Sequence, residues 1–408
     1  MHVLFISNYW PPEIAAPAHL GFELGETLVR FGHRVTVVTR FPTHNVLAIP
    51  PEYERRWMYE EEMAGMRVLR IAAPTTQGPA RVKRGLGHLV VAPLFALRAF
   101  RVRDVDVVYT MSPPLPLALS AWVVARRRRA AFCLGVQDLF PQSAIDLGVL
   151  RSRAVIKFFE AMERFAYRSA EAVTVHSEGN RHHVILKGGD PARVHAVPNW
   201  VDTEFIQPSD RINAFRKAAG LNGEFVVLFA GTMGWSQGLG VAVEAARYLA
   251  TEPELVFLLV GDGVDRPSLA AMASGLPNIR FLPMQPKELY PSVLAAADAC
   301  LVTLRPEVAT PVVPSKLLTI MAAERPVLAS MPLAGDAPAI IAQSGCGIAC
   351  PAGDARSLAD AVLYLRRNRT AALEMAQNGR RFVEAHFSRV ECVRKFERLF
   401  AEILRRPT

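Results

Sequence analysis

Two series of short apolar runs, most of them followed by a helical segment, constrain the fold of this chain more than any other feature. In the first half the runs predict strands at 2–7, 33–39, 106–110, 131–136 and 171–177. In the second half they predict strands at 224–231, 255–261, 279–283, 298–304 and 325–330. A pair of helices, at 370–385 and 388–405, ends the chain. Continuous β-branched runs that alternate with helices are typical of parallel sheets covered on both faces, so an α/β protein is predicted.

The segment 197–208, VPNWVDTEFIQP, interrupts the alternation with prolines and marks a linker. Because 408 residues exceed one ordinary core, we expect two domains. We place a first Rossmann-like domain at 1–200, a second at 201–385, and a C-terminal helix at 386–408 that packs back on the first domain. Both sheets are predicted to be doubly wound. Ligands of such sheets bind at the carboxyl ends of the strands, so the two domains should face each other across a cleft.

The charge of the chain indicates an anionic partner without choosing one. Lys and Arg number 47 against 38 Asp and Glu, which gives a net charge of +9. Phosphate ligands, an anionic membrane face and nucleic acid all fit this excess. The N-terminal MHVLFISNYW lacks the basic segment of a signal peptide, and no apolar run reaches the roughly 18 residues of a membrane span. Five scattered cysteines favour reduced thiols in the cytoplasm, with Cys346 and Cys350 as buried small residues instead of metal ligands.

A lone cation stands at the start of an apolar helix in VPSKLLTIMAAERPVLAS, residues 313–330. Lys316 would lie in the first helical turn, where the helix dipole disfavours positive charge. An anion bound at that helix end would explain the position, because a lysine and helix N–H groups together hold and neutralise a diphosphate. A solvated lysine near a helix start is the alternative reading of the same residues.

A glycine-rich loop follows the first strand of the second half. The segment 230–246, AGTMGWSQGLGVAVEAA, runs from strand to helix through Gly231, Gly234, Gly238 and Gly240. Small residues there allow a phosphate to approach the backbone of a helix N-terminus. The next loop, VGDGVDRPSL, holds Asp262 between glycines, and a tight turn explains it equally well. The first loop of the chain, 7–18, contains no glycine, which argues against a nicotinamide dinucleotide site.

Two basic segments surround apolar helices. Residues 80–103 carry six Lys or Arg and no acid, and residues 116–132 contain four consecutive arginines, 126–129. Basic residues beside an exposed apolar helix are typical of an anchor on an anionic bilayer. Core packing of the apolar parts is the alternative, as is nucleic-acid contact by the arginines. Few aromatic residues stand among them, which disfavours single-strand binding.

Nine segments in order resemble the retaining family 4 glycosyltransferases of the GT-B fold. They include YWPPEIAAPAHLGFELGETLVRFGHRVTVVTRFP, GMRVLRI, SPPLPLAL, VQDLFPQSAIDLGVL, ERFAYRSAEAVTVHSEGNR, VPNWVDTEFIQP and VGDG, besides the two segments that hold Gly231 and Lys316. Within that family the chain is most similar to enzymes that build bacterial O-antigen and exopolysaccharide units on a polyprenyl lipid.

The resemblance implies that the second domain holds a nucleotide-diphosphate sugar, and that the first binds the acceptor. It implies no metal and no resident cofactor, since the nucleotide sugar is a co-substrate. Asp138 matches the position of an acceptor-side acid or base, and an N-cap of the following helix is its alternative role. The donor residues implied are Gly231, Thr232, Gly234, Gln237, Gly238, Gly261, Asp262, Met284, Ser315, Lys316, Leu317 and Thr319. Those on the acceptor side are Ala15, Ala16, His44, Asp138 and Asn199.

This sequence departs from the family pattern at charged positions. Thr232 and Gln237 stand where many members have Arg and Lys, which leaves Lys316 as the principal cation. Pro311 and Thr319 stand where two glutamates are frequent, so a hydroxyl would meet the ribose in place of a carboxylate.

The expected protein is therefore a cytoplasmic glycosyltransferase, peripheral at the inner face of the plasma membrane through residues 80–103. It would move a sugar, from a UDP-sugar in preference to a GDP-sugar, to a polyprenyl-linked or other glycan acceptor. Two rival hypotheses remain open: a sugar-nucleotide epimerase on the same fold, and an inactive subunit that binds nucleotide and membrane. Nucleic acid is not an expected partner.

Overall fold

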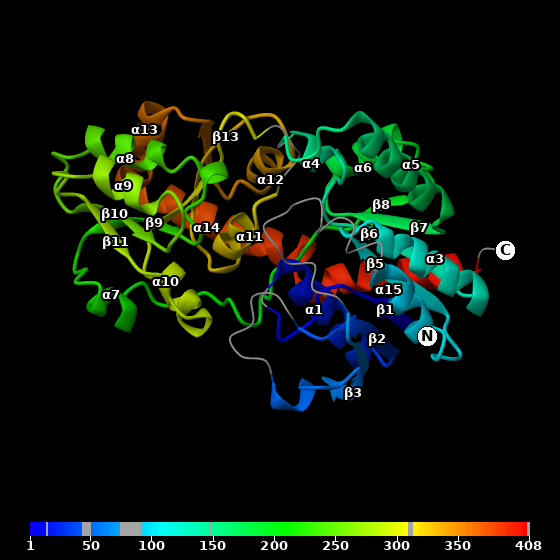
Figure 1. Ribbon diagram of the computed structural model, residues 1–408. Helices are drawn as coiled ribbons and strands as arrows, with labels where there is room; N and C mark the ends of the chain where they lie inside the picture. The colour runs from blue at the N-terminus through cyan, green and yellow to red at the C-terminus, as the bar shows by residue number, and fades with distance from the viewer. Residues whose placement is uncertain (14, 43–49, 74–90, 147, 309–312, 406–408) are drawn as a thin grey trace. The chain divides into compact units, whose positions relative to one another are not determined.

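The computed structural model describes residues 1–13, 15–42, 50–73, 91–146, 148–308 and 313–405, and they form two compact units (Figure 1). The first unit contains Met1–Asn199 and Cys392–Thr408, and the second contains Trp200–Glu391. The chain passes from one unit to the other inside the proline-containing segment 197–208. Each unit is an α/β layer structure of its own.

An eight-stranded sheet with the order β3-β4-β2-β1-β5-β6-β7-β8 forms the centre of the first unit. All neighbouring strands pair in parallel except β3, which pairs with β4 in antiparallel orientation. The strands are β1 His2–Ile6, β2 Arg34–Arg40, β3 Met58–Met63, β4 Met66–Ile71, β5 Val107–Ser112, β6 Ala131–Val136, β7 Ala172–Val175 and β8 Val194–Ala196.

Helices cover both faces of this sheet. They are α1 Ala16–Arg30, a helix at 91–99, α3 Pro116–Arg128, α4 Gln142–Asp146, α5 Arg153–Ser169, α6 Glu178–Leu186 and α15 Arg389–Arg405, with a short 3-10 helix η1 at Pro51–Tyr53. The helix at 91–99, α3, α5 and α6 bury apolar residues against one face, where Leu4, Ile6 and Val38 point. Successive strand residues point to opposite faces, so Phe5 meets Trp10 on the other side.

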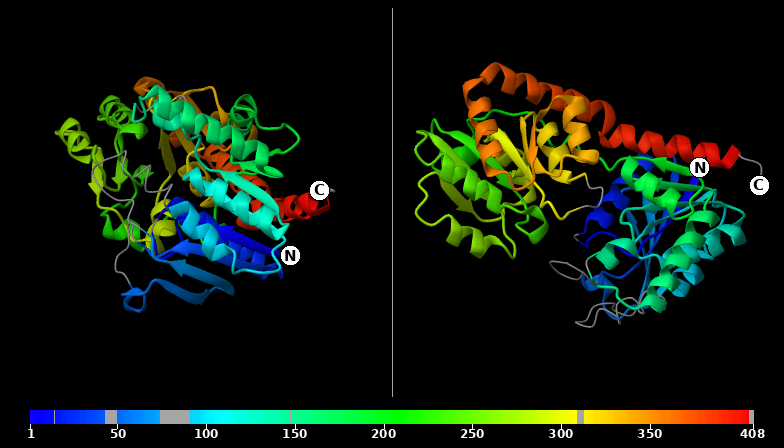
Figure 2. Two further views of the ribbon diagram at one scale, coloured as in Figure 1. Left: turned by 45° about the vertical axis from the view of Figure 1, so that its right-hand side comes forward. Right: turned by 90° about the horizontal axis from the view of Figure 1, so that it is seen from above.

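The last helix of the chain, α15, packs on the sheet of the first unit (Figure 2). Its Phe396 and Phe400 rings lie 5.8 and 6.0 Å from the ring of Tyr109 in β5. The imidazole Nε2 of His33 also lies 2.8 Å from Oε1 of Glu397. The end of the sequence is therefore part of the core of the unit in which the sequence begins.

The second unit has a six-stranded parallel sheet with the order β11-β10-β9-β12-β13-β14. The strands are β9 Phe225–Ala230, β10 Leu255–Val260, β11 Ile279–Leu282, β12 Ala299–Thr303, β13 Val327–Met331 and β14 Gly347–Pro351. Chain order reverses between β9 and β12, so this pair is the switch point of the sheet. In open α/β sheets such a switch point is where ligands bind.

Helices cover both faces of the second sheet too. They are α7 Ala214–Ala218, α8 Gly240–Tyr248, α9 Arg266–Met272, α10 Tyr290–Ala295, α11 Ser315–Ala322, α12 Asp336–Ser344, α13 Ala355–Arg367 and α14 Arg369–His386, with 3-10 helices η2 Trp235–Gln237 and η3 Lys287–Leu289. Helices α10, α11 and α12 pack on the face of Val226 and Leu228, and α8, α9 and α13 pack on the face of Val227 and Phe229.

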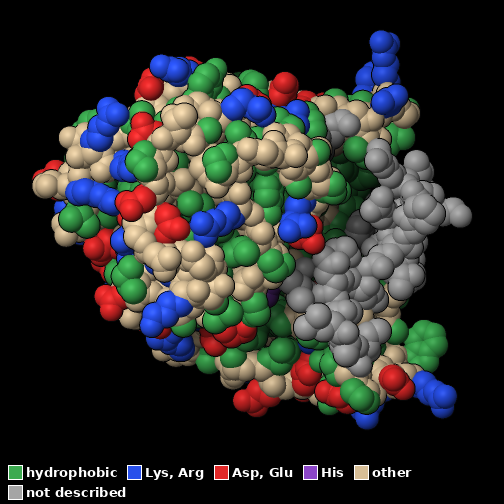
Figure 3. All heavy atoms as spheres, turned by 90° about the vertical axis from the view of Figure 1, so that its left-hand side faces the viewer, with side chains coloured by type: hydrophobic (Ala, Val, Ile, Leu, Met, Phe, Trp, Pro, Cys, Tyr) green, Lys and Arg blue, Asp and Glu red, His purple; other side chains and the backbone are tan. Residues whose placement is uncertain are grey.

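The surface of the second unit around α8 and α9 carries Lys or Arg and Asp or Glu side chains interspersed with one another (Figure 3). Several of these charges pair along their own helix or with a neighbour. Arg247 lies 3.3 Å from Glu244 on α8, and Arg356 of α13 lies 3.9 Å from Asp360. This surface thus has no preference for one sign of charge.

All ten predicted strands are confirmed, but the sequence pattern missed β3, β4, β8 and β14. Three of these four lie at an edge of their sheet. An edge strand is covered less completely than a central one, so its sequence does not need a continuous apolar run. In β3, for example, the residues MYEEEM alternate between exposed and half-buried.

The expectation of an exposed apolar helix within 80–103 is wrong for the part that the structure describes. Residues 80–90 lie outside the described residues. In the helix at 91–99, Val91, Phe95 and Ala99 are buried in the core of the first unit. Leu97 is the one large apolar side chain described in this segment that is mainly exposed, at 63%. Core packing, the alternative reading, accounts for these residues.

Candidate functional site

Lys316 lies in the first turn of α11, at the carboxyl edge of the second sheet, and its side chain is turned inward. The Nζ atom donates a hydrogen bond to Oε1 of Gln237, at 3.0 Å, and lies 4.9 Å from the centre of the Phe229 ring. Within the described chain no carboxylate pairs with this ammonium group. Burial lowers the pKa of Lys316 from its ordinary value of 10.5 to about 8. A partly buried cation without a counter-charge is a favourable place for an anion.

The missing side chain of Gly231 makes room for Lys316. Gly231 follows β9 with a φ of +138°, and a Cβ added there would lie 2.6 Å from Cε of Lys316. At the same end of α11 no acidic residue occupies the first turn, and the N-cap residue Pro314 provides no side-chain bond. The positive end of the helix dipole and the ammonium group therefore both lie at this edge of the sheet, and no acidic side chain of the described residues pairs with either.

Arg305 is a second cation at this switch point, and the sequence analysis missed it. It comes two residues after the end of β12, and its guanidinium carbon lies 4.9 Å from the centre of the Trp235 ring. Its Nε donates to the carbonyl oxygen of Trp235 at 2.6 Å, and its backbone N–H donates to that of Ser236 at 3.0 Å. A Cβ added to Gly238 would lie 2.8 Å from Cγ of Arg305. Arg305 is thus held against the glycine-rich loop by its Nε atom and its backbone, and its Nη atoms donate no hydrogen bond to the described residues.

Gly261 has a different physical role from Gly231. A Cβ at Gly261 would overlap the carbonyl oxygen of Gly231, and one at Gly263 would overlap that of Met233. The two loops are joined by hydrogen bonds from Gly231 N to Val260 O, at 2.9 Å, and from Met233 N to Asp262 O, at 2.8 Å. Close contact of two backbones therefore explains these glycines. The carboxylate of Asp262 accepts a bond from Gly263 N, and its side chain remains exposed.

The other predicted donor residues differ in what they can offer a ligand. Thr232 and Met284 are exposed beyond the ends of β9 and β11, and Ser315 is exposed at the start of α11. Gly234 has no atom within 4 Å of an added Cβ. Thr319 is half-buried; its hydroxyl donates to Lys316 O at 3.0 Å and lies 3.2 Å from the hydroxyl of Tyr290. Leu317 is fully buried in the core, so its side chain packs the unit instead of facing a ligand.

The predicted acceptor residues that the structure describes belong to the first unit and follow the carboxyl ends of its strands. Asp138 is exposed after β6, and its Oδ2 accepts a bond from the hydroxyl of Ser143 at 3.1 Å, at the start of α4. Asn199 donates to Oε1 of Gln137 at 2.9 Å. Ala15 is the N-cap residue of α1, and Ala16 is its first residue. His44 and Pro311 lie outside the described residues.

Asn8 is a further polar group at this edge that the sequence analysis did not single out. It comes two residues after the end of β1, where chain order reverses between β1 and β5. The residue is 2% exposed, and in the part of the chain that the structure describes neither Nδ2 nor Oδ1 has a hydrogen-bond partner. A buried amide without partners is costly, which indicates a place where a ligand hydroxyl group would bond.

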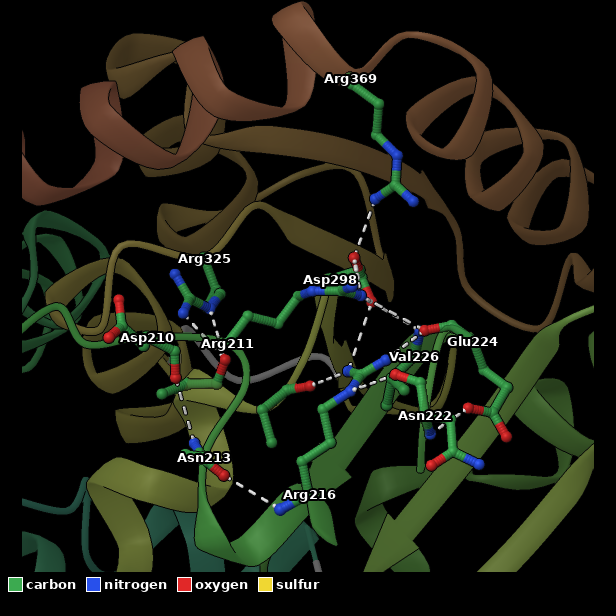
Figure 4. A network of polar contacts seen from close by, with 12 residues as sticks. Asp210, Arg211, Asn213, Arg216, Asn222, Glu224, Val226, Asp298, Arg325 and Arg369 are labelled. Atoms are coloured by element: carbon green, nitrogen blue, oxygen red, sulfur yellow. Dashed lines mark hydrogen bonds and ion pairs between the residues drawn. The ribbon is translucent and has the colours of Figure 1, made fainter. Parts of the chain in front are cut away.

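At the opposite, amino-terminal edge of the second sheet, a charge network has a structural role (Figure 4). Asp298, with a side chain 3% exposed, accepts bonds of 2.8 Å from both Arg211 and Arg369 and one of 2.9 Å from Val226 N. Arg216 lies 3.7 Å away. The carboxylate ties the segment after the linker and the start of α14 to the sheet, far along the strands from Lys316.

Both halves of the chain match glycosyltransferase families. Residues 22–200 match the Glycosyl transferase 4-like domain, and residues 224–368 match the Glycosyl transferases group 1 domain. This chain belongs to the family 4 glycosyltransferases of the GT-B fold.

The relatives of this glycosyltransferase include two bacterial proteins. It is 29% identical over 332 residues to WcaI of Escherichia coli (strain K12), whose name assigns it to colanic acid biosynthesis as a glycosyl transferase; 79% of this chain and 81% of WcaI are covered. It is 29% identical over 283 residues to WbjE of Pseudomonas aeruginosa, named as a glycosyltransferase, with 68% of this chain and 70% of WbjE covered.

Solved structures share the fold of the glycosyltransferase at low sequence identity. Anabaena HepE in complex with UDP has a TM-score of 0.73 at 17% identity and covers 98% of this chain and 100% of that one. WaaG, a glycosyltransferase involved in lipopolysaccharide biosynthesis, has a TM-score of 0.65 at 16% identity, with 98% and 99% covered. At such identities the likeness establishes the fold.

The described residues of the glycosyltransferase contain no group of three or more His, Cys, Asp or Glu placed to hold a metal ion. The five cysteines are all buried as free thiols, and burial raises the pKa of both Cys346 and Cys350 to about 11. Among the helices that the structure describes, none combines the length and apolar character needed to cross a membrane.

Proposed function

We propose that this glycosyltransferase moves a sugar from a nucleotide-diphosphate sugar to a polyprenyl-linked or other glycan acceptor in cell-surface polysaccharide biosynthesis, with retention of configuration. A UDP-sugar is favoured as donor. The observation that carries the proposal is the partly buried, unpaired ammonium group of Lys316 beside Gly231. The name of the relative WcaI supports the pathway, and the fold neighbour HepE in complex with UDP supports the nucleotide.

On the donor side, Lys316, Gln237 and Arg305 surround the place proposed for the diphosphate. The acceptor oxygen bonds to the anomeric carbon while the bond from that carbon to the phosphate oxygen breaks, so negative charge develops on the leaving diphosphate. A cation already in place, at the positive end of α11, stabilises that charge without reorganisation. Arg305 adds the second cation that Thr232 and Gln237 do not provide. The proposed reaction requires no metal and no resident cofactor, because these side chains neutralise the leaving group.

On the acceptor side, a base takes the proton of the attacking hydroxyl group. Asp138 is exposed at the carboxyl end of β6 and has the chemistry for this role. Asn8, with a buried and unpartnered amide, is proposed to bond an acceptor hydroxyl group. Retention requires that the acceptor attack on the face that the diphosphate leaves. The enzyme is proposed to act in the cytoplasm, peripherally at the inner face of the plasma membrane.

The donor assignment is tested by measuring UDP affinity and UDP-sugar turnover in Lys316→Ala and in Lys217→Ala, an exposed lysine of α7 in the same unit. Loss of a charge-assisted contact at Lys316 should weaken UDP binding roughly 10- to 100-fold. The Lys217 variant should bind UDP like the natural protein. Full affinity in Lys316→Ala would refute the assignment. UDP binding without transfer to any lipid-linked acceptor would instead favour the inactive subunit.

A further inference from the structure

The outer side of α5 in the first unit carries exposed aromatic rings. The helix buries Phe159, Met162 and Tyr167 against the sheet, whereas Phe158 and Phe165 point outward, 49% and 37% exposed. These two phenylalanines are seven residues apart, which is two helical turns, so they lie on the same side of α5. Exposed phenylalanines on one helix face are a signal for a contact with another apolar phase.

The neighbouring helix α3 extends this apolar area. The rings of Phe165 and Trp122 pack edge to face with their centres 5.1 Å apart. Val123 follows on α3 and is 41% exposed, and Val155, one turn before Phe158 on α5, is 40% exposed. We call this area the α3–α5 surface, formed by Trp122, Val123, Val155, Phe158 and Phe165.

The exposed charges of α3 and α5 are of one sign. The exposed basic residues of the two helices are Arg126, Arg127, Arg153, Lys157, Arg164 and Arg168. All residues of α3 and α5 are described, and none of their acidic residues is exposed. Glu160 is half-buried 3.3 Å from Lys187, and Glu163 is buried, where its carboxylate accepts a bond from the hydroxyl of Tyr167. The surface of the second unit in Figure 3, by comparison, carries charges of both signs.

We propose that the α3–α5 surface lies on an anionic lipid bilayer. Phenylalanine and valine side chains would enter the boundary between headgroups and acyl chains, and the surrounding Lys and Arg would contact anionic headgroups. Single-stranded nucleic acid fits less well, because its bases stack on aromatic faces, whereas Val123 and Val155 offer aliphatic surface. This inference deepens the proposed function, since it gives a lipid-linked acceptor a defined approach to the first unit, but it does not depend on the donor site.

The proposal also replaces the segment expected from the sequence. The helix at 91–99 lies on the same face of the sheet as α3 and is joined to it by a bond of 2.7 Å from the Ser120 hydroxyl to Ala92 O. Because Val91, Phe95 and Ala99 of that helix are in the core, we assign the membrane contact to the side chains of α3 and α5 that the core leaves exposed.

The test is sedimentation of the full-length protein with vesicles of phosphatidylcholine alone and of phosphatidylcholine mixed equally with phosphatidylglycerol. The natural protein should bind the anionic vesicles and not the neutral ones. The double variant Lys157→Glu/Arg164→Glu, which breaks no ion pair found among the described residues, should reduce binding by about tenfold or more. The double variant Phe158→Ser/Phe165→Ser should reduce it as well. Matched changes on the second unit, Arg367→Glu and Leu373→Ser, should leave binding unchanged.

Three outcomes would overturn the proposal: no binding of the natural protein to anionic vesicles, undiminished binding by both double variants, or binding to single-stranded RNA in place of vesicles. The same variants are examined for their melting temperature and for its rise on addition of UDP. An unchanged rise shows that the donor site is intact. If UDP does not raise the melting temperature of the natural protein, that result counts against the proposed function but not against the proposed membrane surface.

Discussion

The ammonium group of Lys316 is in an environment that disfavours its own charge. It is partly buried, it lies at the positive end of α11, and among the described residues its polar partner is the neutral amide of Gln237. Burial and the helix dipole favour the neutral amine, and the Gln237 amide supplies no negative charge to offset them. A bound diphosphate reverses the balance, because it supplies the missing negative charge. The free protein thus holds a site that is completed by its ligand.

This arrangement predicts that UDP affinity depends on pH. The free protein loses the proton of Lys316 as the pH rises through about 8, and UDP binding must then recover that proton. Affinity should be flat below pH of about 7 and should fall by at most tenfold for each pH unit above about 8. Titration calorimetry of UDP binding at a series of pH values measures how steeply the affinity falls. The variant Lys316→Met should bind weakly and without this slope, and a flat profile in the natural protein would contradict the prediction.

The stability of the ligand-free protein should change with pH in the opposite direction. The pKa of Lys316 is lowered on folding, so between about 8 and 10.5 the unfolded chain binds more protons than the folded one. The contribution of this group to the free energy of unfolding therefore rises with pH across that window. UDP affinity should fall with pH while the free energy of unfolding rises. Measuring both quantities therefore separates an effect on the site from a general effect on the fold.

At the scale of the elements, the switch between β9 and β12 determines where the cations lie. The loop after β9 brings Gly231 and Gln237 to Lys316, and the loop after β12 brings Arg305 to Trp235. A glycine is required in this loop wherever another group occupies the space that a Cβ atom would fill.

Substitution of Gly231 by alanine should affect both stability and donor binding. Alanine would have to adopt a φ near +138° and would displace the Lys316 side chain. We expect the free energy of unfolding to fall by about 1–3 kcal/mol and UDP binding to weaken. The matched variant Gly234→Ala has a φ of −114° and open space around the added carbon, so it should be close to neutral. Chemical denaturation and UDP titration of both variants measure the difference.

The network around Asp298 predicts a loss of stability without a direct effect on the donor site. Replacing this buried carboxylate by alanine leaves Arg216, 1% exposed, without its counter-charge and should cost about 3–5 kcal/mol. Arg369→Ala, which removes a side chain 54% exposed, should cost less than about 1 kcal/mol. Equal losses in the two variants, measured by denaturant unfolding, would contradict the assigned role of Asp298.

At the scale of the whole molecule, the chain returns from the second unit to complete the first. Residues from Cys392 onward belong to the first unit, although nearly two hundred residues of the second unit precede them. The first unit therefore folds completely only after the entire chain is available.

Truncation of the Phe400 side chain should destabilise the first unit selectively. Its ring is fully buried beside Tyr109, so Phe400→Ala should lower the free energy of unfolding of that unit by about 3–5 kcal/mol. Leu404→Ala, at a side chain 40% exposed on the same helix, should have an effect below about 1 kcal/mol. Calorimetry with UDP present should assign the transitions, since the nucleotide is expected to stabilise the second unit by mass action. An effect of Phe400→Ala on the UDP-sensitive transition alone would contradict this division.

What the sequence determined by itself is local. Central strands can be recognised as continuous apolar runs because both of their faces are covered. Helices can be recognised by the periodicity of their apolar residues. The two doubly wound sheets, the GT-B fold and the position of Lys316 at a helix start could all be predicted from such patterns or from the resemblance that they carry.

What only the tertiary structure decided depends on which distant segments become neighbours. Arg305 is one of many arginines in the sequence, and only the pairing of β12 with β9 brings it to the glycine-rich loop. Asn8 stands out because its amide is buried without partners, and Phe158 and Phe165 because the core leaves them exposed. Burial and contact across a sheet depend on strand order, which the periodicity of a sequence does not contain, so these residues had to be found in the folded chain.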